Sequence, residues 1–112
     1  MIKLSKRLEA ISSLIPKNSN IIDIGCDHGL LDIYLYQKKM CNKIIASDVN
    51  ENALNSAVNN IKKYHLEKSI ETRLGNGLDT ITDLDNIDNE LINDSYVYKV
   101  ENGSIIYKNY DI

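Results

Sequence analysis

Three short apolar segments, each ending at a glycine or an acid, constrain this chain of 112 residues more than any other feature. They are "NIIDI" at 20–24, "NKIIASD" at 42–48 and "SIETRL" at 69–74, the last followed by "GNG" at 75–77. Segments of this length that are rich in isoleucine and bounded by turn residues are typical of buried strands. The sequence therefore predicts three short strands.

Amphipathic segments precede and separate these predicted strands. Residues 4–15 carry an apolar stripe at helical spacing, and Pro16 then ends the predicted helix. Residues 29–39 and 50–66 predict two further helices, and Asn50 can cap the second of them. Strands that alternate with helices are typical of an α/β fold with a parallel sheet and right-handed crossovers.

The pattern changes beyond residue 78. Residues 1–78 have a net charge of +3, whereas residues 79–112 carry eight acidic and two basic side chains. The stretch "YVYKVENGSIIYKNYDI" alternates apolar and polar residues around Asn102-Gly103, which predicts a β-hairpin at about 95–109. A chain of this length forms one domain, so we expect residues 83–112, an acidic linker plus the hairpin, to complete the domain built by residues 1–82.

Several functional classes are disfavoured by composition. Cys26 and Cys41 form no CxxC motif and no metal-ligand spacing with the two histidines, so we expect two buried thiols and no metal site. No stretch resembles a transmembrane span or a signal peptide. We therefore expect a cytoplasmic protein without a membrane partner.

The segment "IIDIGCDHGLL" at 21–31 predicts a ligand-binding turn between the first strand and the second helix. In parallel sheets, ligands bind beyond the carboxyl ends of the strands, where the turns at 25–29, 48–50 and 75–77 should converge. Dinucleotide folds use G-x-G-x-x-G at this position, but here Asp27 replaces the middle glycine and would repel a pyrophosphate. A nicotinamide-binding fragment is therefore the less favoured enzyme class.

S-adenosylmethionine suits these residues better, because it carries a sulfonium and an ammonium group and no phosphate. Asp23 and Asp27 can offset this positive charge, and Asp48 can accept hydrogen bonds from both ribose hydroxyls. Asn76 offers a donor and an acceptor to the adenine edge. Two alternatives stay open: Asp23 can instead bind loop amides, and His28 can act as a general base or contact the ligand or the backbone.

A family resemblance rests on "LSKRL" at 4–8, "DIG-x-DH" at 23–28, Asp48 and "RLGNGL" at 73–78. Over residues 4–82 the chain resembles the bacterial tRNA (adenine(22)-N1)-methyltransferase family, which is Rossmann-like and S-adenosylmethionine-dependent. The resemblance implies a class I methyltransferase sheet, here truncated to three parallel strands and followed by a β-hairpin. It also implies methylation of N1 of an adenine, with tRNA as the partner and residues 1–82 as the cofactor-binding domain.

The resemblance extends to single residues, none of which receives a catalytic role. The residues expected to bind the cofactor are Asp23, Gly25, Cys26, Asp27, His28, Asp48, Val49, Asn76 and Gly77. The residues of the turn at 25–29, the glycine turn, would line the methionine end of the cofactor. Asp48 and Val49 would hold the ribose and one face of the adenine. Asn76 and Gly77 would hold the adenine edge, and Arg7 would reach towards the pocket or the tRNA.

The chain departs from the family after its third predicted strand. The family continues with a helix and a fourth strand ending in an "AGMGG"-like segment, whereas "DNIDNELINDS" at 85–95 runs straight into the hairpin-like tail. We therefore expect weak cofactor binding with slow or absent methyl transfer; the alternative is a non-catalytic remnant or binding module. Without a fourth strand, residues 21–24 form an exposed edge that the hairpin covers or that pairs in a homodimer.

Overall fold

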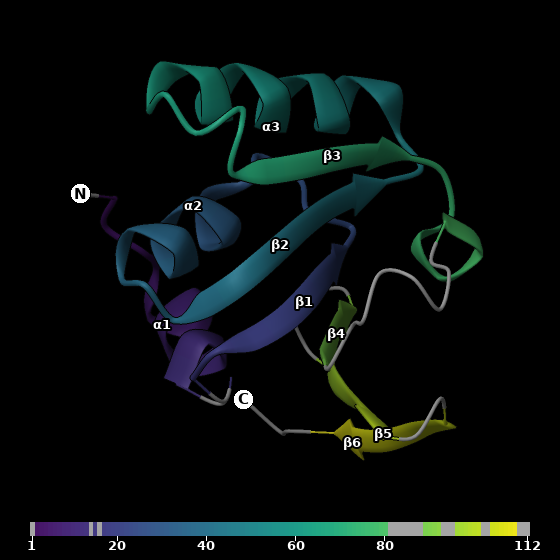
Figure 1. Cartoon of the computed structure of the whole chain (residues 1–112). Coiled ribbons are helices and arrows are strands. Elements are labelled where there is room, and N and C mark those ends of the chain that lie inside the picture. Colours follow the sequence, from purple (N-terminus) through teal and green to yellow (C-terminus); the bar gives the residue numbers. More distant parts are fainter. Residues whose placement is uncertain are drawn as a thin grey trace.

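The computed structural model describes residues 2–13, 15, 17–80, 89–92, 96–101 and 104–109. Within these residues, helices and strands alternate along the first 74 positions and strands follow (Figure 1). The helices are α1 (Lys6–Ser13), α2 (Leu30–Gln37) and α3 (Glu51–Lys63), with a 3-10 turn η1 (Gly77–Thr80). The strands are β1 (Ser19–Ile24), β2 (Cys41–Asp48), β3 (Ile70–Leu74), β4 (Asn89–Ile92), β5 (Tyr96–Glu101) and β6 (Ser104–Asn109).

The strands form one sheet in the order β3-β2-β1-β4-β5-β6. β1 pairs in parallel with β2 and with β4, and β2 pairs in parallel with β3. The helices α2 and α3 connect β1 to β2 and β2 to β3, as parallel pairing requires. The three predicted parallel strands are thus confirmed, and their carboxyl ends lie at one edge of the sheet.

The structure corrects the expectation for the edge of β1. The segment predicted as an acidic linker contains β4, which pairs with β1 from Ile21↔Asn89 to Ile24↔Ile92. A fourth parallel strand, β4, therefore covers this edge, and the hairpin does not. The edge through which a homodimer was expected is already paired within the chain. β5 pairs antiparallel with β4 and with β6, but the Asn102-Gly103 turn lies outside the described residues.

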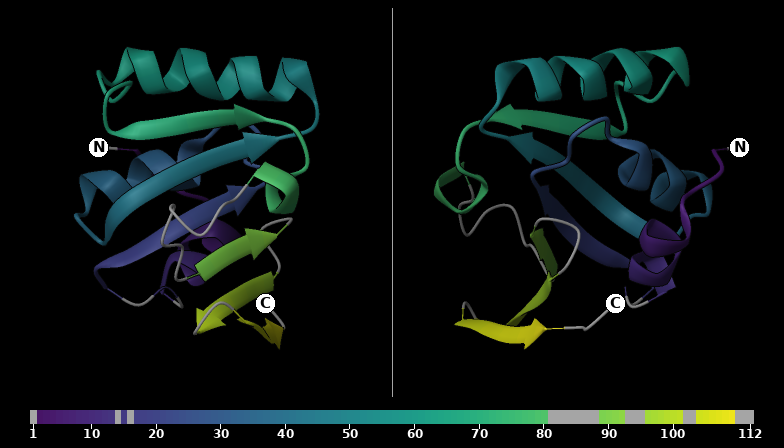
Figure 2. Two further views of the ribbon diagram at one scale, coloured as in Figure 1. Left: turned by 45° about the vertical axis from the view of Figure 1, so that its right-hand side comes forward. Right: turned by 180° about the vertical axis from the view of Figure 1, so that it is seen from behind.

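The main core lies between the sheet and the helices on one of its faces (Figure 2). Its most buried members come from β1 and β2 and from the inner sides of α2 and α3; they include Ile21, Ile33, Leu35, Ile44, Ala57 and Ile61. On the opposite face, Ile22 and Ile45 form a smaller buried cluster with Ile24 packed against it. Alternation of β1 and β2 side chains between the two faces explains why both strands read as nearly continuous apolar runs.

The inner face of α3 follows its predicted spacing, and α2 adds a buried acid. Leu54, Ala57 and Ile61 of α3 are buried, as expected for a stripe at positions i, i+3 and i+7. α2 also buries Asp32 completely, which no apolar pattern could indicate. No helix in the described part of the chain is long and apolar enough to span a membrane.

Asn50 caps α3, and its removal is expected to destabilise the fold. Its Oδ1 accepts a hydrogen bond from the Ala53 amide at 3.0 Å, satisfying one donor of the first helical turn. Asn50→Ala is expected to lower the free energy of unfolding by about 1 kcal/mol in a urea titration. Asn50→Asp keeps the acceptor and should stay within a few tenths of a kcal/mol of the wild type; equal losses in both variants would contradict the capping role.

Candidate functional site

The turn between β1 and α2 is held against the end of β2 by backbone hydrogen bonds. The amides of Gly25 and Cys26 both donate to the Ser47 carbonyl at 2.9 Å. Gly25 and Gly29 adopt positive φ angles of 80° and 71°, and Asp27 also has a positive φ of 39°. Such angles favour glycine, so the two glycines of the G-x-x-x-G motif allow the chain to reverse within five residues.

Gly29 has a second role, because it lies against α3. A Cβ at this position would meet the Cβ of Ala57 at 3.1 Å and its Cα at 3.4 Å. The small residues at these two positions therefore let the start of α2 approach α3 closely. This contact positions the glycine turn relative to the helix that follows Asp48.

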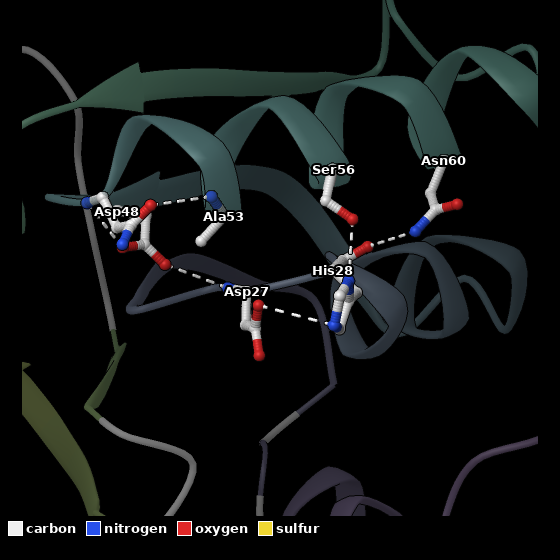
Figure 3. Close-up of polar contacts among 7 residues, drawn as sticks. Asp27, His28, Asp48, Ala53, Ser56 and Asn60 are labelled. Atoms are coloured by element: carbon white, nitrogen blue, oxygen red, sulfur yellow. Dashed lines mark hydrogen bonds and ion pairs between the residues drawn. The ribbon is translucent and has the colours of Figure 1, made fainter.

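Asp48 connects all three turns at the carboxyl edge of the sheet, and Figure 3 shows its contact with Asp27. One carboxylate oxygen accepts the Asp27 amide at 3.1 Å, and the other accepts the Asn50 amide at 2.9 Å. Its backbone carbonyl accepts the Gly75 amide at 2.9 Å. The residue is buried, yet each carboxylate oxygen has lone-pair capacity for a further donor. Asp48 thus organises the turns and still offers two acceptors to a ligand.

His28 is fixed on α3 by two residues that the sequence analysis does not identify. Its Nδ1 forms a 2.7 Å hydrogen bond with Ser56 Oγ, and its carbonyl accepts a 2.8 Å bond from Asn60 Nδ2 (Figure 3). Its Nε2 lies 3.6 Å from Asp27 Oδ1. Ser56 and Asn60 stand four positions apart on the face of α3 near the turn, and this i, i+4 spacing is the signal that could have found them.

The third turn places Asn76 at the surface. Asn76 is exposed, its carbonyl accepts the Asp79 amide at 2.8 Å, and Gly77 begins η1. Arg73, just before this turn, donates from Nη1 to the Thr80 carbonyl at 2.6 Å. The sequence predicts Asn76 and Gly77 as site residues and indicates no separate role for Arg73.

Two exposed apolar side chains flank these turns. Val49, directly after Asp48, is 72% exposed, and Leu74, at the end of β3, is 55% exposed. Leu74 pairs with Asp48 across the two strands, so it stands beside the same edge of the sheet. Val49 is among the residues predicted to bind the cofactor, whereas Leu74 is not. The apolar residue at the end of the third predicted strand is the sequence feature that could have indicated Leu74.

Charge at the site is purely acidic. The turns at 25–29, 48–50 and 75–77 contain Asp27 and Asp48 and no lysine or arginine. Asp27 is exposed, whereas Asp23 is completely buried within β1 and Cys26 is buried in the turn. The exposed carboxylate of Asp27 therefore suits a cation and disfavours a phosphate.

A pocket of about 150 Å³ opens beside the glycine turn. Leu8 of α1 lines it together with Cys26, Asp27, His28 and Leu30. Arg7 belongs to the same helix, α1. Among the described residues, no group of His, Cys, Asp or Glu side chains is arranged to hold a metal ion.

Both cysteines are buried and free, and their thiols resist ionisation. Burial raises the pKa of Cys26 above its ordinary value, and the nearby carboxylates of Asp32, Asp23 and Asp48 raise it further. Burial also raises the pKa of Cys41, from 9.0 to about 11. Cys26 is therefore a packed thiol of the turn and a poor nucleophile near neutral pH.

The raised pKa values predict a loss of stability at alkaline pH. Between pH 9 and about 11 the unfolded chain loses the Cys41 proton and the folded chain keeps it, so stability falls as pH rises. In urea titrations across this range, wild-type stability should fall more steeply than that of Cys41→Ala. Parallel slopes for the two proteins would contradict the prediction.

Comparison with known proteins identifies the family. A family model described as a methyltransferase domain matches residues 4–93. The chain belongs to the methyltransferase domain family. The predicted methyltransferase family is thereby confirmed.

Curated relatives of this methyltransferase domain include enzymes with different named substrates. The tRNA (adenine(22)-N(1))-methyltransferase of Bacillus subtilis (strain 168) is 34% identical over 80 residues, covering 71% of this chain. The ribosomal protein L11 methyltransferase of Staphylococcus epidermidis is 32% identical over 108 residues, covering 88% of this chain. The chain spans 34% of the length of each of these relatives.

Solved structures give the same fold. Sp1610 of Streptococcus pneumoniae, described as a putative tRNA (m1A22) methyltransferase in complex with S-adenosyl-L-methionine, matches with a TM-score of 0.77 and 33% identity. TrmK of M. capricolum, in complex with S-adenosyl-homocysteine, matches with a TM-score of 0.73 and 40% identity. Each match covers 80% of this chain, and 42% and 40% of the respective relatives. A protein of the NADB-Rossmann superfamily from Streptococcus agalactiae also matches, with a TM-score of 0.78 and 37% identity over 81% of this chain and 40% of its own, and it confirms the Rossmann-like arrangement.

Proposed function

We propose that this chain is the S-adenosylmethionine-binding domain of a methyltransferase that acts on N1 of adenine in tRNA. The observation that carries the proposal is the site around Asp48, whose carboxylate and carbonyl join three turns that contain acids and glycines but no lysine or arginine. The similarity to tRNA (m1A22) methyltransferases, one of them crystallised with this cofactor, supports the same conclusion. Residues 1–82 would form this domain, with the strands beyond them completing its sheet.

The residues of the site fit the cofactor by charge and by hydrogen-bonding capacity. Gly25, Cys26, Asp27 and His28 would surround the methionine end, with Asp23 adding negative charge from below. The two carboxylate oxygens of Asp48 would accept the ribose hydroxyls while they hold the amides of Asp27 and Asn50. A pyrophosphate at the same turn would meet the exposed Asp27 carboxylate, which disfavours a nicotinamide dinucleotide.

The adenine would lie beyond the ends of β2 and β3. Val49 offers an exposed apolar surface for one face of the ring, and Asn76 with Gly77 offers polar groups for its edge. Asp48 would then bind the ribose through polar contacts, and Val49, the next residue along the chain, would contact the adenine through its apolar side chain.

The chemistry requires alignment more than acid–base catalysis. Bound S-adenosylmethionine supplies a methyl group on a positively charged sulfur. N1 of adenine has its own lone pair, so no general base is needed and the contribution of the protein is positioning, which can lower a barrier by several kcal/mol. Among the residues of this chain, Arg7 is the proposed contact to the tRNA. We propose that the protein is located in the cytoplasm, where tRNA is found.

Calorimetric titration of the purified chain with S-adenosylmethionine tests the proposal, with NAD as the competing ligand class. We expect micromolar binding of S-adenosylmethionine and no heat with NAD. Absence of S-adenosylmethionine binding to a chain with a cooperative thermal transition would refute the proposal.

A methyl-transfer assay then tests the substrate. Radioactive methyl incorporation is measured with tRNA, with tRNA whose target adenosine is replaced by guanosine, and with ribosomal protein L11. Incorporation into the first substrate alone supports the proposed specificity, and incorporation into L11 would replace it. Cofactor binding without incorporation into any of them would favour the alternative of a binding module.

A further inference from the structure

The segment that follows β3 closes on itself. Its first residue, Gly75, has a φ of 138°, and a Cβ there would lie 3.3 Å from Thr80 Cγ2, so the two ends of the 75–80 segment are in contact. Within the segment, the Asp79 amide donates to the Asn76 carbonyl at 2.8 Å. The backbone around Asn76 is therefore held in a compact loop.

Arg73 ties the far end of this loop to the strand that precedes it. Its Nη1 donates to the Thr80 carbonyl at 2.6 Å, and its Nε pairs with the Glu71 carboxylate. The Arg73 side chain is only 21% exposed, so solvent competes weakly with this charge-assisted hydrogen bond. The Gly75 amide, bound to the Asp48 carbonyl at 2.9 Å, anchors the near end.

We propose that Arg73 is a positioning residue through which the 75–77 turn recognises the adenine base. The inference rests on the proposed function, because it takes Asn76 as the residue at the adenine edge. Arg73 acts through Thr80: with the loop held at both ends, the exposed Asn76 is presented in a fixed backbone geometry before the ligand arrives. Such preorganisation removes the cost of ordering the loop on binding.

A fixed Asn76 would discriminate between purines. Adenine presents an amino group at its Watson–Crick edge, whereas unsubstituted purine has only a C–H group there, and rotation of the Asn76 amide cannot replace the missing donor. A site built to hydrogen-bond the amino group rejects the base that lacks it, because its polar groups are left unpaired. A loop released from Arg73 could turn its amide towards water and would accept both bases.

The test compares the affinities of S-adenosylhomocysteine and of its analogue with unsubstituted purine in place of adenine, which lacks only the amino group at this edge. We expect wild type to prefer the adenine compound at least about tenfold, the equivalent of one hydrogen bond. Arg73→Met should bind S-adenosylhomocysteine about tenfold more weakly, with a preference below about threefold. Arg73→Lys keeps a cationic donor and should restore most of the preference. Lys68→Met, the matched loss of a cation at an exposed residue before β3, should retain all of it.

A double-mutant cycle separates positioning from general stability. Asn76→Ala should lose the preference by itself, and adding Arg73→Met to it should change the preference no further. Equal weakening of both ligands in Arg73→Met, or no weakening, would overturn the inference while leaving the proposed function intact. If wild type binds neither compound, the proposed function fails and the inference with it. Should Arg73→Met not fold, Arg73→Gln replaces it, and a wild-type preference in that variant would be equally decisive against the inference.

Discussion

Asp48→Ala is expected to reduce the affinity for S-adenosylmethionine at least about 100-fold. Two hydrogen bonds from ribose hydroxyls to a carboxylate contribute about 3 kcal/mol together, which corresponds to this factor. The variant also removes the acceptor of the Asp27 and Asn50 amides, so the turns around the ligand lose their common anchor. Titration calorimetry measures the affinity, and thermal unfolding reports the accompanying loss of stability.

Two further variants separate the roles of this carboxylate. Asp48→Asn retains one acceptor oxygen, and its amide group cannot accept a second backbone N–H, so we expect an intermediate affinity. Glu51→Gln removes one negative charge from the exposed start of α3 without touching the turns, and it should bind like wild type. Wild-type affinity in Asp48→Ala would show that the ribose is held elsewhere.

Gly29→Ala is expected to lower the free energy of unfolding by about 2–5 kcal/mol. The backbone at φ 71° is unfavourable for an L residue by about 1–2 kcal/mol, and the new Cβ would lie 3.1 Å from Ala57 Cβ, an overpacking that costs about 1–3 kcal/mol. For a domain of this size the midpoint of thermal unfolding should fall by about 10–20 °C. Urea titration and thermal melting followed by circular dichroism measure both quantities.

Combining this substitution with Ala57→Gly distinguishes the two causes. Glycine at 57 removes the Cβ that the new methyl group would meet, at a cost of about 1 kcal/mol for glycine inside a helix. If packing dominates, the double variant should be no less stable than Gly29→Ala alone. If the costs simply add, backbone strain is the main cause and the close approach of α2 to α3 matters less than the structure indicates.

Most of the fold up to residue 74 was predictable because its signals are local. Isoleucine-rich segments such as 20–24 and 42–48 and the apolar stripe of α3 each specify their own element within about ten residues. β4 was missed because Asn89–Ile92 is four residues long and lies among acidic residues. Only pairing with β1 makes it a strand, and that pairing is a contact between segments almost 70 positions apart.

The candidate site divides in the same way. The residue types and their order were enough to show that glycines and acids follow the ends of successive parallel strands. This order indicated the ligand class and placed Asp48, Asn76 and the glycine turn at the carboxyl edge of the sheet. Tertiary structure alone decided that Asp23 is buried below that surface, that Ser56 and Asn60 hold His28, and that Arg73 reaches Thr80. Short segments of the sequence determine strand direction and side-chain chemistry. Burial and hydrogen-bond partners depend on which distant segments the folded core brings together.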